Sequence, residues 1–176
     1  MTKRWAAITL ACTMAAASSS SFAAPALHCT LQAPAQVVAG QPVVLHFSVT
    51  NPGLVALQML RWNTPFEGAW LAPFVSVARD GREVEYHGPM VKRAEPKADQ
   101  YLRIQPHASV TADVDLAEPF DVSVPGRYRI QPRLDIADLF ADTAGNPPRP
   151  RSAHKGAKLS CNAVEIRVVP PPTDSR

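Results

Sequence analysis

Apolar and polar residues alternate along four separate stretches of the chain. In the first stretch, apolar side chains occupy every second position, at Val43, Leu45, Phe47 and Val49. The same period recurs over residues 109–116, 127–134 and 164–168. Period-two alternation is typical of strands that bury one face. The pattern therefore predicts an all-β protein.

Turn residues separate these stretches. Asn51-Pro52-Gly53 ends the first strand, and Asp80-Gly81 is typical of a two-residue hairpin turn. The 18 prolines argue against long helices, and only residues 136–141 suggest a single helical turn. Between residues 55 and 62 the apolar parity slips, which predicts a β-bulge.

Seven or eight short strands at about ten-residue spacing predict an immunoglobulin-like antiparallel β-sandwich. The strand candidates extend over residues 24–169, a length that suits one domain with its own core. Residues 170–176 begin with three consecutive prolines, and we expect them to form a disordered tail.

The first residues are predicted to be a secretory signal peptide spanning residues 1–23. Lys3 and Arg4 precede an apolar run, and small residues typical of a cleavage site follow it, just before Ala24. Cleavage is expected after Ala23, with Ala24 as the alternative. A lipoprotein signal ending at Cys12 fits poorly, because a threonine stands where that signal has an aliphatic residue. The mature protein is thus expected in the periplasm or outside the cell.

Charge and cysteine content fit an exported protein. The chain has 18 Lys and Arg against 15 Asp and Glu, and loss of Lys3 and Arg4 leaves 16 against 15. This near-balance does not indicate nucleic-acid binding, and no second apolar stretch is long enough to span a membrane. Cys29 and Cys161 remain after cleavage, and we expect a disulfide between them in an oxidising compartment. The alternative is a reactive thiol beside His28, although adjacent strand residues point to opposite faces.

Motifs for catalysis are missing from the sequence. None of the five histidines is followed by glutamate, as a zinc-peptidase helix requires. No serine stands two residues after a glycine, as the nucleophilic serine does in the strand-to-helix turn of serine hydrolases. The pairs Asp113 with Asp115 and Glu83 with Glu85 lie on the polar side of expected strands. We therefore predict no catalytic residue, no metal ligand and no cofactor.

Two segments are candidates for binding another molecule. The first is aromatic-rich and contains Trp62, Asn63, Thr64, Pro65, Phe66 and Trp70. Its aromatic rings would form either an exposed apolar platform, which often marks a binding site, or a plug beneath a tight turn. The second is the basic, proline-rich segment 142–158, with Arg149 and Arg151. It would dock an acidic partner or be a solvated connection.

The chain resembles the non-catalytic N-terminal β-domain of bacterial deuterolysin and peptidyl-Lys metalloendopeptidase family proteins. The resemblance covers about residues 43–130 and rests on these runs: Phe47-Ser48-Val49-Thr50-Asn51, Leu60-Arg61-Trp62-Asn63-Thr64-Pro65-Phe66-Glu67-Gly68, Tyr86-His87-Gly88-Pro89-Met90-Val91-Lys92-Arg93 and Pro125-Gly126-Arg127-Tyr128. In that family a zinc-binding domain with a His-Glu-x-x-His helix follows, and no position of this sequence matches that motif. The resemblance implies a peptidase-associated module without peptidase activity.

Three functions follow as hypotheses. The first is an exported protein-binding module, an inhibitor-like or prodomain-like partner of another exported protein such as a peptidase. The second is a structural envelope or secreted protein with no link to peptidases. The third is a cryptic metallopeptidase. The oligomeric state does not follow from the sequence.

Overall fold

The computed structural model describes residues 26–172, which contain thirteen β-strands and four short 3-10 helices. No α-helix occurs in this range, so the all-β prediction is confirmed. The predicted signal peptide and the last four residues of the predicted tail lie outside the described range. The strand count exceeds the predicted seven or eight because several strands have only three residues.

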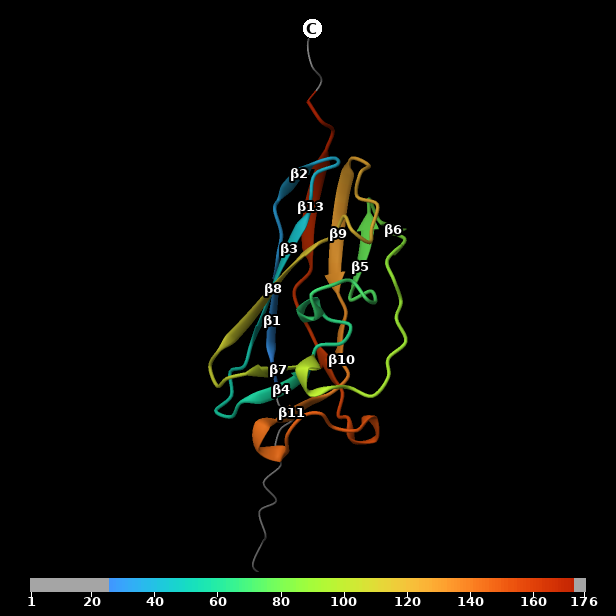
Figure 1. Ribbon diagram of the computed structural model, residues 1–176. Helices are drawn as coiled ribbons and strands as arrows, with labels where there is room; N and C mark the ends of the chain where they lie inside the picture. The colour runs from blue at the N-terminus through green and yellow to red at the C-terminus, as the bar shows by residue number, and fades with distance from the viewer. Residues whose placement is uncertain (1–25, 173–176) are drawn as a thin grey trace, which may run out of the picture.

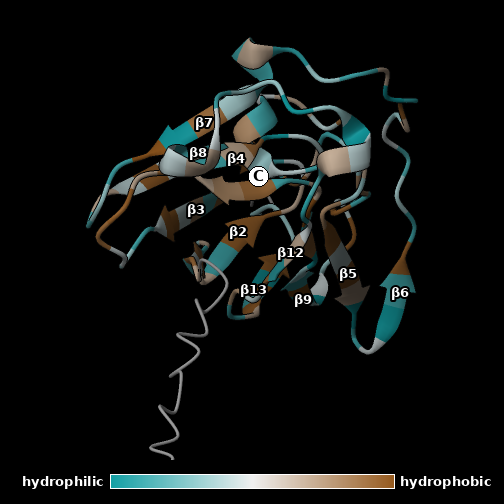
Figure 2. Cartoon of the chain, turned by 90° about the horizontal axis from the view of Figure 1, so that it is seen from below, coloured by the Kyte–Doolittle hydropathy of each residue, from teal (hydrophilic) through white to brown (hydrophobic). Residues whose placement is uncertain are grey.

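A five-stranded sheet forms one layer of the sandwich, in the order β2-β13-β9-β5-β6. Its strands are β2 (Gln36–Val38), β13 (Val164–Val169), β9 (Gly126–Pro132), β5 (Val75–Arg79) and β6 (Arg82–Val84). Every pairing is antiparallel except that of β2 with β13, which is parallel and departs from the purely antiparallel prediction. Figure 2 shows β5 coloured mostly hydrophobic and the outer strand β6 mostly hydrophilic.

The second layer is a three-stranded sheet in the order β1-β3-β8. Its strands are β1 (His28–Gln32), β3 (Val44–Thr50) and β8 (Ser109–Asp115). Alternate residues of β3 point into the core, where Leu45, Phe47 and Val49 are fully buried. They belong to one core cluster with Tyr128, Ile130 and Ile166 of the five-stranded sheet. The four alternating stretches of the sequence are thus β3, β8, β9 and β13.

A third sheet, ordered β11-β4-β7, lies at one end of the molecule (Figure 1). It consists of β11 (Leu139–Ala141), β4 (Leu57–Leu60) and β7 (Tyr101–Ile104), and β10 (Leu134–Ile136) pairs nearby with β12 (Ala157–Leu159). The helical turn expected at residues 136–141 is therefore wrong. These residues instead belong to β10, β11 and the two residues between them.

The parity slip in β4 has a different cause from the expected bulge. β4 pairs residue for residue with β7, and all four of its residues are buried. Leu57 and Met59 belong to the main core, whereas Leu60 packs with Trp62, Tyr101 and Phe140 in a second cluster. The strand is buried on both faces, so no single parity marks its inner side.

Two local features fit the immunoglobulin-like architecture. Tyr128 at the start of β9 donates its hydroxyl to the Val124 carbonyl at 2.7 Å, the arrangement of a tyrosine corner. Asp80 and Gly81 join β5 to β6 with positive φ angles of 48° and 82°, as a two-residue hairpin turn requires.

The disulfide between Cys29 and Cys161 is confirmed. Its Cα atoms lie 4.7 Å apart and its sequence separation is 132 residues. Cys29 belongs to β1 of the three-stranded sheet, whereas Cys161 precedes β13 of the five-stranded sheet. The bond therefore links the two layers of the sandwich.

Candidate functional site

The aromatic segment turns around a short 3-10 helix, η1 (Pro65–Glu67). Thr64 caps this helix, because its hydroxyl oxygen accepts a hydrogen bond from the Phe66 amide. The hydroxyl also donates to the Arg61 carbonyl at 2.6 Å. Gly68 ends the helix with a φ of 82°, a left-handed conformation that favours glycine. Thr64 is therefore a fully buried structural residue.

The three aromatic side chains of the segment do not form an exposed platform. Trp62 and Trp70 are each 5% exposed, and Phe66 is 9% exposed. Trp70 stacks on Phe74 with ring centroids 4.0 Å apart, while Trp62 lies in the second core cluster. Apolar rings of this size gain more from burial than from contact with water. The structure thus corresponds to the plug interpretation.

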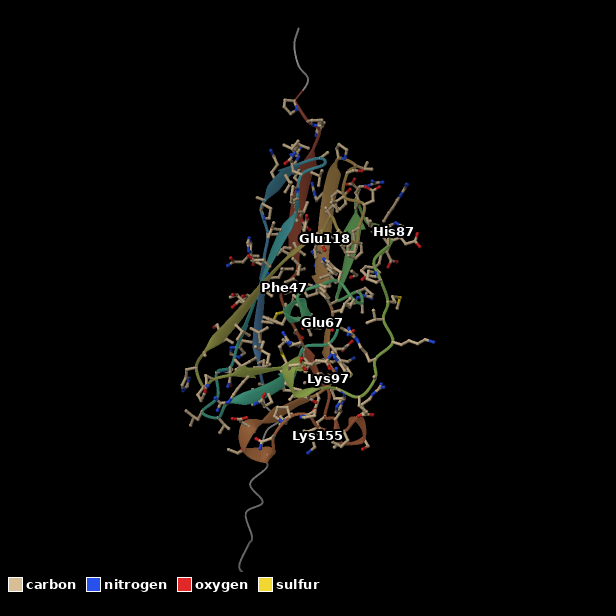
Figure 3. The ribbon with its side chains drawn as sticks, in the orientation of Figure 1. Phe47, Glu67, His87, Lys97, Glu118 and Lys155 are labelled. Carbon is tan, nitrogen blue, oxygen red and sulfur yellow. A yellow bond between two sulfur atoms is a disulfide. The ribbon has the colours of Figure 1, made fainter. Side chains whose placement is uncertain are left out.

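Asn63 is exposed, unlike the other five candidate residues of the segment, and it takes part in a network around Arg93. The guanidinium of Arg93 donates to both carboxylate oxygens of Glu67, at 2.5 and 2.8 Å, and to the Asn63 side-chain oxygen at 2.9 Å. It also lies over the Trp62 ring, 5.5 Å from the centroid. Glu67 lies between the five-stranded sheet and the third sheet (Figure 3). The network fixes η1 and the residues before it to the segment around residue 93.

Arg149 is not free to dock an acidic partner. Its guanidinium lies 3.6 Å from the carboxylate of Asp138 and 4.5 Å from the centroid of Phe140. Asp138 is fully buried and accepts hydrogen bonds from the Tyr101 hydroxyl at 3.0 Å and the Lys155 amide at 2.9 Å. Burial, and then the hydrogen bond to Asp138, raises the pKa of Tyr101 to about 12. Arg149 therefore anchors the proline-rich segment to the second core cluster.

Arg151 is exposed but also makes contacts within the chain. Its amide donates to the Glu95 carboxylate at 3.1 Å, and its guanidinium donates to the Arg93 carbonyl at 3.1 Å. The segment 142–158 is therefore held against the segment around residue 93. Of the two arginines proposed to dock an acidic partner, Arg149 is paired within the chain, whereas Arg151 is exposed.

A hollow of about 470 Å³ lies between η1, β7 and β8. We call it the β8 groove, and its walls are formed by Arg61, Pro65, Phe66, Gly68, Leu102, Val110, Thr111, Ala112 and Asp113. Four consecutive residues of β8 line it. Because side chains of a strand alternate between faces, a hollow touching all four lies along the strand's edge. The groove thus combines apolar walls with the backbone of an edge strand.

Backbone groups of β8 point into this groove. β8 pairs only with β3 in its sheet. At the two ends of this pairing, the Leu116 amide donates to the Val43 carbonyl, and the Asn51 amide donates to the Ala108 carbonyl. Leu116 and Ala108 therefore direct backbone groups toward β3. Hydrogen-bonded and non-bonded pairs alternate along an antiparallel ladder, so the N–H and C=O groups of Ser109, Thr111 and Asp113 point away from β3.

The next outward carbonyl along β8, that of Asp115, accepts the Trp70 indole N–H at 3.0 Å. This contact ends the open stretch at one side. Within residues 26–172, the backbone groups of Thr111 and Asp113 have no hydrogen-bond partner. They are therefore available to another strand.

The opposite edge of the same sheet is covered at one residue, Leu31 of β1. There the Leu31 amide and carbonyl both point away from β3, and the Asn162 side chain bonds both of them at 2.9 Å. This side chain takes the place of a neighbouring strand. Natural proteins usually cover or shorten edge strands, because open ones pair with other chains. β8 is a seven-residue edge strand in which Thr111 and Asp113 are exposed, and η1 packs beside it.

The described residues contain no group of three or more His, Cys, Asp or Glu side chains that could hold a metal ion. Within the same range, no helix is long and apolar enough to cross a membrane. The carboxylate pairs noted in the sequence lie at the surface. The Asp113 carboxylate contacts the His46 imidazole at 2.7 Å.

Comparison with known proteins gives one curated relative. It is an extracellular protease from Aeromonas hydrophila, 33% identical over 89 residues, which are 51% of this chain and 25% of that protein. The chain therefore spans about a quarter of the length of that relative. No family model matches the sequence.

Two solved structures align with the chain at low TM-scores. The CARDB domain of a Pyrococcus furiosus protein, solved with di-metal ions, aligns with a TM-score of 0.36 and 13% identity, over 82% of this chain and 89% of that one. A mutant β-glucosidase from Listeria innocua, in complex with laminaribiose, aligns with a TM-score of 0.31 and 12% identity, over 81% of this chain and 16% of that one. The described residues form an all-β domain, and about half of the chain is homologous to part of an extracellular protease.

Thr111 and Asp113 were missed as functional candidates by sequence reasoning. In the sequence, both residues simply belong to the polar face of an amphipathic strand. Whether a strand lies at the centre or the edge of a sheet depends on its tertiary partners, and the pattern of β8 resembles that of the central strand β3.

Proposed function

We propose that this chain is an exported, non-catalytic β-domain that binds an extended segment of another protein by strand addition to β8. The observation that carries the proposal is the open edge of β8 beside an apolar groove. In this mode of recognition, main-chain hydrogen bonds supply affinity and adjacent side-chain pockets supply specificity.

The geometry offers both elements. The outward N–H and C=O groups of Thr111 and Asp113 would pair with the backbone of the added strand. Phe66 and Leu102 would contact its alternate side chains in the β8 groove. The disulfide links the two layers of the sandwich, and an edge preorganised by the folded sandwich would lose little conformational entropy on binding.

Homology to part of an extracellular protease supports export and suggests the partner class. We propose that the partner is an exported protein, with a secreted peptidase as the leading candidate. The domain would act on it as an inhibitor-like or prodomain-like module. A purely structural envelope protein remains the alternative, and it would have no ligand at β8.

The test uses a proline variant designed from the hydrogen-bond pattern. The Thr111 amide points outward, so Thr111→Pro removes a donor from the open edge without removing a bond to β3. Thr111→Val is the matched control, because it keeps the amide and changes only the exposed side chain. Peptides are selected from a random display library on the mature protein, and their affinities for the three proteins are measured.

We expect the selected peptides to bind the wild type and Thr111→Val alike, and Thr111→Pro at least about tenfold more weakly, because a hydrogen bond and its geometry are lost. Circular dichroism and thermal melting check that Thr111→Pro folds. Peptides that bind all three proteins equally would contradict strand addition. Turnover of casein by the purified protein would contradict the non-catalytic assignment.

A further inference from the structure

The outer face of the five-stranded sheet carries two arginines directly opposite each other. Arg127 of β9 and Arg167 of β13 are Cα partners in the antiparallel ladder, so their side chains leave the same face. Both side chains are exposed. Like charges directly opposite each other destabilise a sheet. Such an arrangement suits the binding of a negative group.

Charged groups next to this arginine pair already have partners within the chain. Arg129, two residues along β9, forms an ion pair with Glu165 at 3.4 Å. The Asp80 carboxylate accepts the Arg127 backbone amide at 3.1 Å. Within the described part of the chain, neither Arg127 nor Arg167 forms an ion pair through its side chain.

The two arginines line a hollow of about 440 Å³ at the end of the sheet. Its other walls are Asp80, Pro125, Gly126, Val168, Val169 and Pro170. The side chains of Val169 and the two prolines give it an apolar rim, and Asp80 adds one negative charge. Guanidinium groups form paired hydrogen bonds with carboxylates.

We propose that Arg127 and Arg167 bind an acidic side chain of a partner protein, with the apolar rim contacting the residue beside it. A dense polyanion such as a nucleic acid or sulfated glycan fits less well, because Asp80 and Glu165 would repel its successive charges. The site lies on the other sheet from the β8 groove, so it does not depend on strand addition.

The test is an NMR titration of the mature, isotopically labelled protein. The probe is the blocked peptide acetyl-Gly-Glu-Val-Glu-Gly-amide, and its control has glutamine in place of both glutamates. We expect saturable shifts of the Arg127, Arg167 and Val168 amides with the glutamate peptide alone, weakening as salt is added. Arg127→Gln with Arg167→Gln should reduce affinity by about tenfold or more.

Four binding results would overturn the proposal. They are equal shifts with the glutamine peptide, unchanged affinity in the double variant, tighter binding of a sulfated tetrasaccharide or an oligonucleotide, and equal binding of a glutamate-free peptide with a free carboxyl end. Thermal melting of Arg167→Gln adds an independent readout. We expect its melting temperature to be unchanged or higher, because a like-charge pair is removed. A clear decrease would indicate a structural role and would also overturn the proposal.

Discussion

The indole N–H of Trp70 donates to the carbonyl of Asp115 at 3.0 Å. This hydrogen bond joins the aromatic plug to the edge strand β8 and occupies the last of its outward backbone groups. The open part of the edge therefore begins at Asp113. Trp70 thus lies in the core beside β8, and we do not expect it to contact a partner.

Trp70→Phe should lower the free energy of unfolding by about 1–3 kcal/mol, because the Asp115 carbonyl loses its partner. Trp62→Phe is the matched control: Trp62 is equally buried, but its indole N–H has no hydrogen-bond partner within residues 26–172. Denaturant unfolding of both variants gives the comparison. A smaller loss for Trp70→Phe than for Trp62→Phe would contradict the role of this bond.

The disulfide should contribute strongly to stability. It joins residues 132 apart, and on the chain-entropy model a crosslink over such a loop contributes about 5 kcal/mol. Replacing both Cys29 and Cys161 by alanine should lower the free energy of unfolding by about that amount. Denaturation of the wild type with and without a reductant gives a second measurement. Identical midpoints for the oxidised and reduced protein would contradict the expectation.

Removal of the Asp138 side chain should be costly. Asp138→Ala leaves the Tyr101 hydroxyl, the Lys155 amide and the Arg149 charge without their buried acceptor, and we expect a loss of about 3–5 kcal/mol. Asp113→Ala is the control, because the Asp113 pair with His46 is exposed. That change should cost no more than about 1 kcal/mol. Similar losses measured by urea unfolding would argue against the anchoring role of Asp138.

Stability should also fall at high pH because of Tyr101. Its pKa is raised in the folded protein to about 12 from the ordinary value of 10.0, by burial and by the hydrogen bond to Asp138. The folded state therefore favours the protonated phenol, and this contribution is complete below pH 10. It is lost as the pH rises from 10 toward 12. Tyr101→Phe should show a smaller decrease over this range, and an equal decrease would exclude Tyr101 as a cause.

The sequence predicts the sandwich well because most of its strands bury one face. β3, β8, β9 and β13 each read as alternating stretches, and the two cysteines pair as their compartment suggests. β4 could not be read in this way, since Leu57 and Leu60 belong to different cores. Residues 136–141 were misread because the short strands β10 and β11 lack a clear period.

The candidate site was harder to predict. A run with Trp62 and Phe66 is equally compatible with a platform and a plug, because composition does not specify which side of a turn faces the core. Arg149 looks like a surface charge until its tertiary partner Asp138 is known. The open edge at Thr111 depends on which strands pair, and only the assembled sheets reveal it.

Amide hydrogen exchange at Thr111 and Asp113 tests strand addition most directly. Both amides should exchange rapidly in the free protein, since neither bonds to β3. On saturation with a selected peptide they should slow by at least about tenfold, because each would then donate to the added strand. Unchanged exchange at both amides in the saturated complex would contradict binding at β8.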